Sequence, residues 1–363
     1  MTSRREVRSV YIEWAKLRSK ARFGLSTSDV LHFPLAEMHA RIEDLSLSPP
    51  GGYGYKPLLE RLAARADVSV DRVVQAQGTS MANHLAMAAL LEPGDEILIE
   101  EPTYEALLAA AQYLGAKILR FPRKFEAGFQ VDPREVQRAA SPRTRLIVIT
   151  NLHNPSGVRT ADSSLKIVGE IARGLGAHVL VDEVYIESCF DAPWQSAIHL
   201  GPNFIATSSL TKAYGLTALR CGWVLAAPAL AERMWRLNDL FGSVSPYPTD
   251  LLSVMALDQL PQIAARAKKL LDTNRALLKA FLDSRKDLVA IWPEAGTIVF
   301  PRLTTGHADA FCQLLLEKYE TSVVPGRFFE APGHFRIGVG GETEKVRDGL
   351  SRVAAALDEF ARL

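Results

Sequence analysis

Residues 146–181, LIVITNLHNPSGVRTADSSLKIVGEIARGLGAHVLV, contain two apolar β-rich runs separated by a helical pattern. The runs are Leu146–Thr150 and His178–Val181, and the helical pattern covers Leu165–Gly174. Consecutive parallel strands need a crossover of this kind, usually a helix. The segment therefore predicts a strand–helix–strand unit of a parallel sheet.

The same alternation continues on both sides of this unit. Helical stretches are predicted at Met81–Leu91 and Glu105–Tyr113. Further strands are predicted at Val73–Ala76, Glu96–Ile99, Lys117–Arg120, Asn203–Thr207 and Trp223–Ala226. The pattern is typical of an α/β fold with a mostly parallel, seven-stranded sheet covered by helices on both faces. In such sheets, ligands bind at the carboxyl ends of the strands.

The pattern changes after Pro248. We expect one long helix at Leu260–Arg285 and a closing amphipathic helix at Glu344–Leu363. Strands are predicted at Ala290–Leu303, Ser322–Val324 and Phe335–Val339. We therefore expect a large domain over residues 45–270 and a smaller α+β domain formed by residues 1–44 and 271–363.

Composition excludes several classes of protein. The 363 residues include 42 basic and 41 acidic side chains, whereas a nucleic-acid-binding protein usually has a basic excess. Cys189, Cys221 and Cys312 form no C-x-x-C pair, which argues against a disulfide scaffold or a zinc site and favours the cytoplasm. No apolar run reaches the ~18 residues of a membrane span or resembles a signal peptide.

Two segments place reactive side chains near strand ends. In VDEVYIE, residues 181–187, Asp182 ends a buried-type strand, where it can pair with a ring nitrogen of a ligand or simply be solvated. In SSLTKAYGLTALRCGW, residues 208–223, Lys212 follows a strand; it is either a surface lysine or a pocket lysine whose pKa is lowered. Ser209, Thr211 and Arg220 lie beside it and suit a phosphorylated aldehyde.

Two further segments offer ligand contacts. In QAQGTSMANHLAMAALL, residues 75–91, Gly78, Thr79 and Ser80 begin a helix whose free N–H groups suit a phosphate, although simple helix capping is the alternative. In TNLHNPSGV, residues 150–158, Asn154 precedes a proline, and its amide can donate to a phenolate oxygen, although a Pro-Gly turn is the alternative.

Taken in order, the segments GTS, EPTY, NLHNPSG, VDEVY, SSLTKAYGLTALR and HFRIGVG resemble those of the class I/II aminotransferases, whose best-known member is aspartate aminotransferase. The resemblance covers about residues 50–340. It implies the fold type I architecture and pyridoxal phosphate (PLP) as cofactor. It also implies ping-pong transfer of an amino group between an amino acid and a 2-oxo acid.

The resemblance assigns roles to individual residues. Lys212 holds the cofactor as a Schiff base and moves a proton between the substrate Cα and the cofactor C4′. Asp182 pairs with the pyridinium nitrogen, and Tyr104 stacks on the ring. The phenolic oxygen is bound by Tyr185 and Asn154. The phosphate is held by Gly78, Thr79, Ser80, Ser209 and Arg220.

The resemblance also implies a homodimer with shared active sites. A tyrosine of the partner subunit reaches the phosphate in this family, and here Tyr53 is favoured slightly over Tyr55. Arg336 is expected to bind the substrate α-carboxylate, with Asn154 beside it. An arginine inside an apolar strand is costly unless paired, so either an anionic ligand or a structural carboxylate must face it.

Other readings stay open. Similar enzymes catalyse C–S lysis, other eliminations or cyclisation, because the same electron sink serves these reactions. A PLP-sensing regulator is the non-enzyme alternative, and a dinucleotide oxidoreductase would need a G-x-G-x-x-G motif that is missing here. The segment ARFGLSTSDVLHFPLAEM, residues 21–38, has Ser26–Val30 where many relatives have Gly-x-Pro. No second arginine for a side-chain carboxylate is evident, so the substrate is left open.

Overall fold

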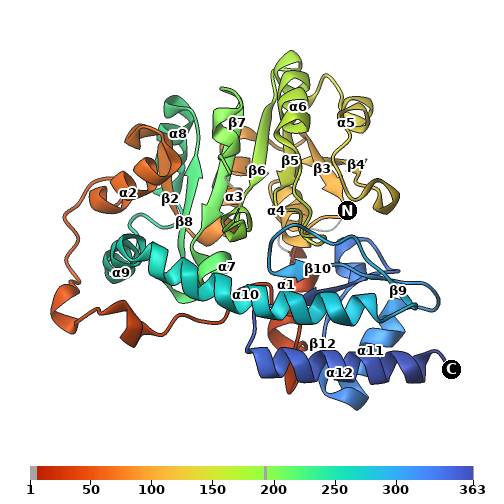
Figure 1. Ribbon diagram of the computed structural model, residues 1–363. Helices are drawn as coiled ribbons and strands as arrows, with labels where there is room; N and C mark the ends of the chain where they lie inside the picture. Colours follow the sequence, from red (N-terminus) through yellow and green to blue (C-terminus); the bar gives the residue numbers. More distant parts are fainter. Residues whose placement is uncertain (1–5, 192–193, 363) are drawn as a thin grey trace.

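The central feature of the computed structural model, which describes residues 6–191 and 194–362, is a seven-stranded sheet (Figure 1). Its strands lie in the order β2-β8-β7-β6-β5-β3-β4, and β8 alone runs antiparallel to its two neighbours. The strands are β2 (Val73–Gln77), β3 (Glu96–Glu101), β4 (Lys117–Pro122), β5 (Thr144–Thr150), β6 (His178–Asp182), β7 (Phe204–Ser209) and β8 (Cys221–Leu225). The predicted mostly parallel sheet is confirmed, with boundaries shifted by one or two residues.

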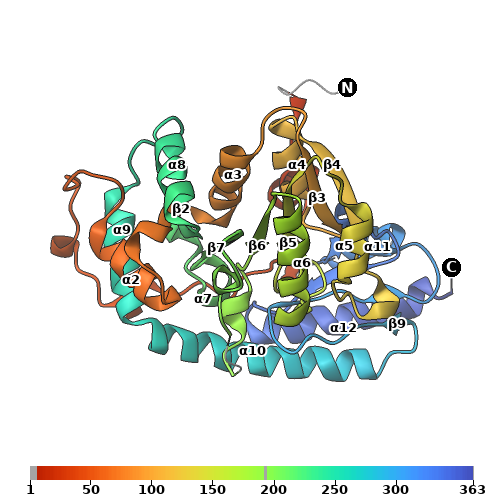
Figure 2. The same ribbon diagram turned by 90° about the horizontal axis from the view of Figure 1, so that it is seen from above.

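Helices cover both faces of this sheet (Figure 2). One face packs against α3 (Gly78–Leu90), α4 (Glu105–Tyr113) and α8 (Pro228–Asn238). The other packs against α5 (Pro133–Ala139) and α6 (Asp162–Gly174), with α2 (Lys56–Ala66) at the β2 end.

Strand β5 shows why the sheet is apolar on both sides. Leu146 and Val148 belong to the core beneath α3, whereas Ile147 and Ile149 belong to the core beneath α6. Successive side chains of a strand point to opposite faces, so a strand covered on both faces needs an unbroken apolar run. The run ends at Thr150, which pairs with Asp182 of β6, and Asp182 pairs with Thr207 of β7. Polar residues therefore meet at one edge of the sheet.

The C-terminal part contains long helices and short strands. The helices are α9 (Tyr247–Asp258), α10 (Leu260–Asp283), α11 (Ala308–Tyr319) and α12 (Thr343–Phe360). The strands are β9 (Leu288–Val289), β10 (Ile298–Val299), β11 (Arg302–Leu303), β12 (Thr321–Ser322), β13 (Val324–Pro325) and β14 (Phe335–Gly338). Helices α10, α11 and α12 pack over a core that includes Leu271, Phe311, Phe335 and Val353, whereas α9 packs against α2 beside the large sheet.

The single strand predicted at Ala290–Leu303 is wrong, because residues 290–297 form no strand. The carbonyl oxygens of Pro293 and Gly296 accept hydrogen bonds from the guanidinium of Arg275 in α10, at 2.5 and 3.2 Å. A side chain therefore satisfies backbone groups that a neighbouring strand would otherwise bind. Similarly, the strand predicted at Ser322–Val324 is two short strands, β12 and β13.

The N-terminal segment joins both parts of the molecule. Strand β1 (Phe23–Gly24) pairs in parallel with β12, as Phe23 opposite Thr321. Helix α1 (Val10–Leu17) lies beside α4 of the large sheet, where Ser9 donates a hydrogen bond to Glu105. The division into domains at about residues 45 and 270 stays a prediction.

Two expectations from composition can be compared with the structure. All three cysteines are free and buried, so none forms a disulfide. Within residues 6–191 and 194–362, no helix is long and apolar enough to cross a bilayer.

Candidate active site

A cavity of about 710 Å³ lies at the edge where β5, β6 and β7 end. The chain segments that line it are distant in sequence: helix α1, residues 26–29, the start of α3, and the loops after β5, β6 and β7. Of the predicted site residues, nine line it directly: Thr79, Ser80, Tyr104, Asn154, Asp182, Tyr185, Ser209, Lys212 and Arg220. Gly78 and Arg336 lie behind the lining, hydrogen-bonded to Arg220 and Asn154 respectively.

Lys212 lies in the short helix α7 (Thr211–Tyr214), which begins just after β7 ends. Its side chain is 27% exposed, and its Nζ lies 4.0 Å from Oδ1 of Asp29. Burial lowers the pKa of this amine, but the neighbouring Tyr185 and Asp29 raise it by more, so the net pKa lies above its ordinary value. The predicted lowering of this pKa is therefore wrong, because acidic neighbours outweigh both burial and the nearby cation Arg336.

Asp182 is the last residue of β6 and is buried. Its Oδ2 accepts a hydrogen bond from Nδ2 of Asn83 at 2.7 Å, and its Oδ1 accepts one from the Val184 amide at 3.1 Å. Burial raises the pKa of this carboxyl to about 6 despite those hydrogen bonds. A cationic ring nitrogen beside Asp182 would offset the cost of burying its charge.

Asn154 and Tyr185 line the same cavity as Asp182. The backbone N–H of Asn154 donates to Oγ1 of Thr150 at 3.0 Å, which fixes the loop after β5. The Asn154 Oδ1 accepts from Arg336, and no described residue accepts a hydrogen bond from its Nδ2. Tyr185 is 3% exposed, and burial raises the pKa of its phenol. Both side chains suit a phenolic oxygen of a ligand.

Hydroxyls and N–H groups gather around Arg220 and the start of α3. The Gly78 amide donates to the Arg220 carbonyl at 2.8 Å, and Thr79 donates to Ser209 at 2.9 Å. Gly78 has φ +74°, and a Cβ there would collide with the Arg220 guanidinium. The Thr211 hydroxyl is buried and has no partner among the described residues. This combination of helix start, hydroxyls and arginine fits a phosphate.

Arg336, in β14, is fully buried. Its Nη1 donates to Asn154 at 2.7 Å, and its Nη2 donates to the hydroxyl of Tyr11 at 2.7 Å and to the Ser26 carbonyl at 3.3 Å. All three acceptors are neutral, and Nε has no partner among the described residues. Among the described residues, no carboxylate pairs with Arg336, so the structural carboxylate considered as an alternative is not found. A buried guanidinium with neutral partners fits an anionic ligand.

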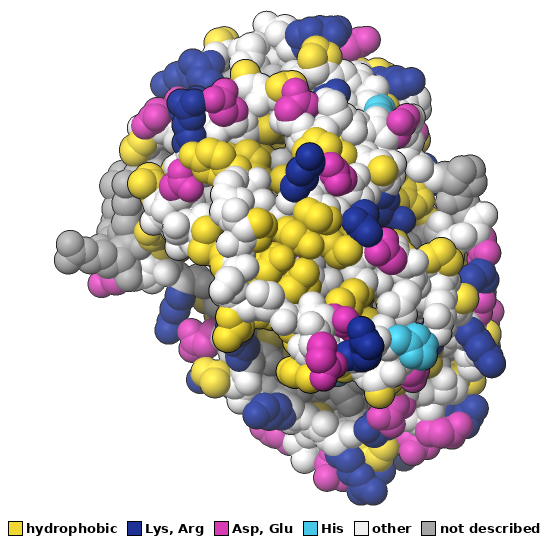
Figure 3. Space-filling view, turned by 90° about the vertical axis from the view of Figure 1, so that its left-hand side faces the viewer, with side chains coloured by type: hydrophobic (Ala, Val, Ile, Leu, Met, Phe, Trp, Pro, Cys, Tyr) yellow, Lys and Arg dark blue, Asp and Glu magenta, His cyan; other side chains and the backbone are white. Residues whose placement is uncertain are grey.

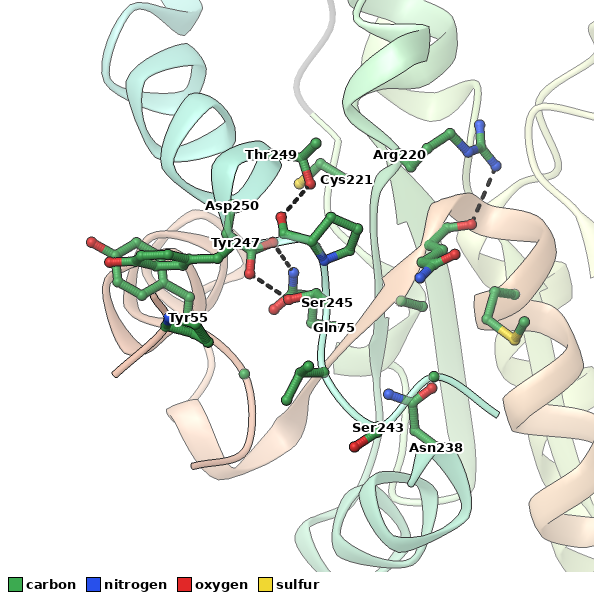
Figure 4. A pocket seen from close by; sticks show the side chains of 18 of the residues that line it. Tyr55, Gln75, Arg220, Cys221, Asn238, Ser243, Ser245, Tyr247, Thr249 and Asp250 are labelled. Carbon is green, nitrogen blue, oxygen red and sulfur yellow. Dashed lines mark hydrogen bonds between the residues drawn. The ribbon is translucent and has the colours of Figure 1, made fainter. Parts of the chain in front are cut away.

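The predicted tyrosines occupy different environments. Tyr104 lines the cavity and packs edge-on against Tyr11, with ring centroids 5.8 Å apart. Tyr53 is exposed, and its hydroxyl donates to Asp239 at 3.0 Å. Tyr55 instead packs against Tyr247 beside a second cavity, which Figure 4 shows together with Arg220. Tyr53 and Tyr55 therefore do not line the cavity around Lys212 in their own chain.

Sequence reasoning missed several residues of the site. Tyr11 and Asp29 come from the N-terminal segment, and Asn83 and Thr150 hold Asp182 and Asn154 in place. Asn83 carries a local signal, because a polar residue on the buried face of an apolar helix needs a partner. Tyr11 carries none, since its partner Arg336 is far away in the sequence.

Comparisons with known proteins agree with this geometry. Residues 28–353 match the family model described as aminotransferase class I and II. The arginine–pyruvate transaminase of Pseudomonas aeruginosa is 30% identical over 85% of this chain and 81% of its own length. A PLP-dependent aminotransferase from Streptococcus suis superposes with a TM-score of 0.92 at 26% identity, over 98% of this chain and 99% of its own. A PLP-dependent cyclase, OrfR, superposes with a TM-score of 0.86 at 25% identity, over 99% of each chain.

Proposed function

The chain belongs to the class I and II aminotransferases and is a PLP-dependent transaminase, and we propose that Lys212 is the residue that holds its cofactor. The observation that supports this most is the arrangement around one cavity. Lys212, Asp182 and Asn154 line it, and Arg336 joins them through its hydrogen bond to Asn154, so four separate parts of the chain meet there.

The roles of the residues follow from their surroundings. Bound PLP supplies an electron sink for negative charge at the substrate Cα. Asp182, held by Asn83, places an ionised carboxylate where a protonated ring nitrogen can lie. Tyr185 and Nδ2 of Asn154 are placed to bind the phenolic oxygen, and Tyr104 lies where it can cover the ring. Gly78, Thr79, Ser80, Ser209 and Arg220 surround the phosphate position.

Arg336 and Lys212 would act on the substrate itself. Arg336 binds the α-carboxylate through two parallel N–H···O bonds, which orients the Cα–H bond. The Lys212 amine lies on the same cavity and removes the Cα proton, which it later returns at the cofactor carbon. With the bound cofactor keeping the amino group and water supplying the keto oxygen, this proton transfer would lead to release of a 2-oxo acid, and the reverse sequence would pass the amino group to a second 2-oxo acid.

The cofactor assignment can be tested by labelling. Borohydride treatment of the purified protein, followed by peptide mapping, should place the reduced cofactor on Lys212. The variant Lys212→Ala should lose the visible absorbance band and the label, whereas Lys166→Ala, on the exposed side of α6, should keep both. A label on another lysine would contradict the proposal.

A second reaction class is supported by one comparison, because the cyclase OrfR matches the whole chain. Cyclisation or elimination would start from the same loss of the Cα proton. Product analysis with a panel of amino acids separates these reactions. Transamination releases one 2-oxo acid per cofactor in the first half-reaction, whereas elimination continues without an acceptor and releases ammonia. A cyclised amino acid would be a third, distinct product.

Basic amino acids should be the first donors tested in this panel. The arginine–pyruvate transaminase is the relative with 30% identity, so arginine and pyruvate are natural first choices of donor and acceptor. The cytoplasmic location inferred from the cysteines stays a prediction.

A homodimer is supported by one face of the molecule. Figure 3 shows hydrophobic side chains gathered on the face that carries α2, α8 and α9. Exposed apolar residues beside α8 and the second cavity are Tyr53, Leu240, Phe241 and Val244. Arg220 lines both the Lys212 cavity and the second cavity of about 130 Å³ on this face, shown in Figure 4. A partner docked here would place Tyr53 close to the phosphate position.

Shared sites predict complementation between two inactive forms. Lys212→Ala and Tyr53→Phe, mixed so that subunits exchange, should give one site per heterodimer with both residues intact. Activity above that of either parent is expected, together with sedimentation as a dimer. An active monomer, or no gain on mixing, would contradict a shared site.

A further inference from the structure

Resting on the proposed transaminase function, we propose that Asp29 recognises a positively charged group on the substrate side chain. The substrate class is then an amino acid with a second basic group, an ammonium or a guanidinium. The proposal rests on the position of residues 26–29, their rigid attachment, and the charges around the cavity.

Residues 26–29 run along the cavity between the two residues that would hold the substrate. At one end, the Ser26 carbonyl accepts a hydrogen bond of 3.3 Å from Arg336. At the other end, Oδ1 of Asp29 lies 4.0 Å from Nζ of Lys212. Three residue steps span at most about 11 Å, so Asp29 is within reach of a substrate whose carboxylate binds Arg336.

The segment is held firmly on β14. The Leu25 carbonyl accepts from the Gly338 amide at 2.7 Å, and the Leu31 amide donates to the Gly340 carbonyl at 2.7 Å. A Cβ at Gly338 would collide with the Thr27 carbonyl, and one at Gly340 would collide with that of Asp29. Gly338 at the end of β14 and Gly340 just after it therefore allow direct backbone contact, which fixes Asp29 relative to Arg336 in β14.

The carboxylate of Asp29 is oriented by Thr217 and forms a long ion pair with Lys212, whose Nζ lies 4.0 Å from Oδ1. Its Oδ2 accepts a hydrogen bond of 3.0 Å from the hydroxyl of Thr217. No described residue donates a hydrogen bond to its Oδ1, because Lys212 lies beyond hydrogen-bond distance. The side chain is 21% exposed, so the free oxygen lies in a partly covered site where a charge–charge contact is stronger than in open water.

Of the cations among the described residues that line the cavity, Lys212 and Arg220 are assigned to the cofactor, and Lys16 of α1 is the remaining positive charge. Apart from Asp29, the one acidic residue among the described residues that line the cavity is Asp182, and Asn83 holds it at the proposed ring-nitrogen position. Arg336 is assigned to the α-carboxylate. A substrate with an acidic side chain would meet Asp29 and be repelled, whereas a basic side chain would find an acceptor.

The experiment compares donors of matched size on the holoenzyme. L-Ornithine, L-lysine and L-arginine are compared with L-norleucine, which is neutral, and with L-glutamate. We expect kcat/KM for the basic donors to exceed that for norleucine by about tenfold or more. In Asp29→Asn this ratio should fall by about 10- to 100-fold, and Asp29→Glu should restore part of it. The control Asp272→Asn, on the exposed face of α10, should leave the ratio unchanged.

A second measurement separates this inference from the transaminase function. 2-Methylornithine and 2-methylnorleucine lack a Cα proton and cannot be turned over, so their dissociation constants report binding alone. Tighter binding of 2-methylornithine by wild-type protein, lost in Asp29→Asn, supports the inference even if no donor is converted. Equal ratios in wild type and Asp29→Asn, or a preference for glutamate or norleucine, would overturn it. If no donor is converted but wild-type protein still binds 2-methylornithine more tightly than Asp29→Asn does, only the transaminase function is overturned.

Discussion

The hydroxyl of Tyr11 accepts a hydrogen bond of 2.7 Å from Nη2 of Arg336, which joins the first helix of the chain to β14. The guanidinium also lies over the Tyr11 ring, 5.6 Å from its centroid. The position of α1 therefore controls the orientation of the arginine proposed to bind the α-carboxylate. It also places Tyr11 against Tyr104, at 5.8 Å between ring centroids.

Tyr11→Phe should raise KM for the amino acid about tenfold while changing kcat much less. The variant keeps the aromatic contact and removes only the hydroxyl, and a hydrogen bond to a charged group contributes about 1.5–3 kcal/mol. Steady-state kinetics checks this, with cofactor absorbance as the control. An unchanged KM, or a loss of bound cofactor, would show that Tyr11 does not act through Arg336.

Gly78→Ala should weaken cofactor binding. Gly78 has φ +74°, and an added Cβ would displace the Arg220 guanidinium from the phosphate position. The backbone strain alone is about 1–2 kcal/mol, and displacement of Arg220 adds to it. Equilibrium titration of the cofactor measures the effect. Gly174→Ala is the matched control, because nothing lies near its Cβ position, and it should bind cofactor as wild type does.

The stability of the cofactor-free protein should fall as pH rises from about 4 to 6, through Asp182. Burial raises its pKa from 3.8 to about 6, so in this range the native state keeps a proton that the unfolded chain has lost. Above pH 6 the ionised carboxylate should lower the free energy of unfolding by at most about 3 kcal/mol. Urea unfolding of wild type and Asp182→Asn, at several pH values, isolates this contribution.

Without cofactor, the free energy of unfolding of Asp182→Asn should exceed that of wild type by an amount that grows between pH 4 and 6 and then levels off. With cofactor bound the order should reverse, because an amide cannot neutralise a cationic ring nitrogen. A difference between the two proteins that is constant across this pH range would rule out Asp182 as the titrating group.

Arg123→Ala should destabilise the protein by about 3–5 kcal/mol. Arg123 donates to Glu100 at 2.8 Å, and both side chains are fully buried. The same carboxylate accepts from the Thr150 amide at 2.8 Å, so the loop that carries Asn154 depends on this pair. Chemical denaturation measures the loss. Because the free energy lost comes from an unpaired Glu100, adding Glu100→Gln to Arg123→Ala should recover part of it.

The sequence alone determined the sheet and the residues that follow its strands. Each predicted strand of the large sheet is present, because unbroken apolar runs separated by helical patterns fit only a sheet covered on both faces. Lys212, Asp182, Asn154 and Thr79 lie at or just beyond strand ends, so their gathering at one edge follows from strand direction.

Only the tertiary structure decided what surrounds these residues. Tyr11 reaches Arg336, and Asp29 reaches Lys212, through contacts between segments far apart in the chain. No local periodicity encodes such contacts, since they depend on how α1 and residues 26–29 pack. The pKa of Lys212 was mispredicted for the same reason: it depends on the sign of the neighbouring charges, and folding placed a carboxylate and phenols beside the amine.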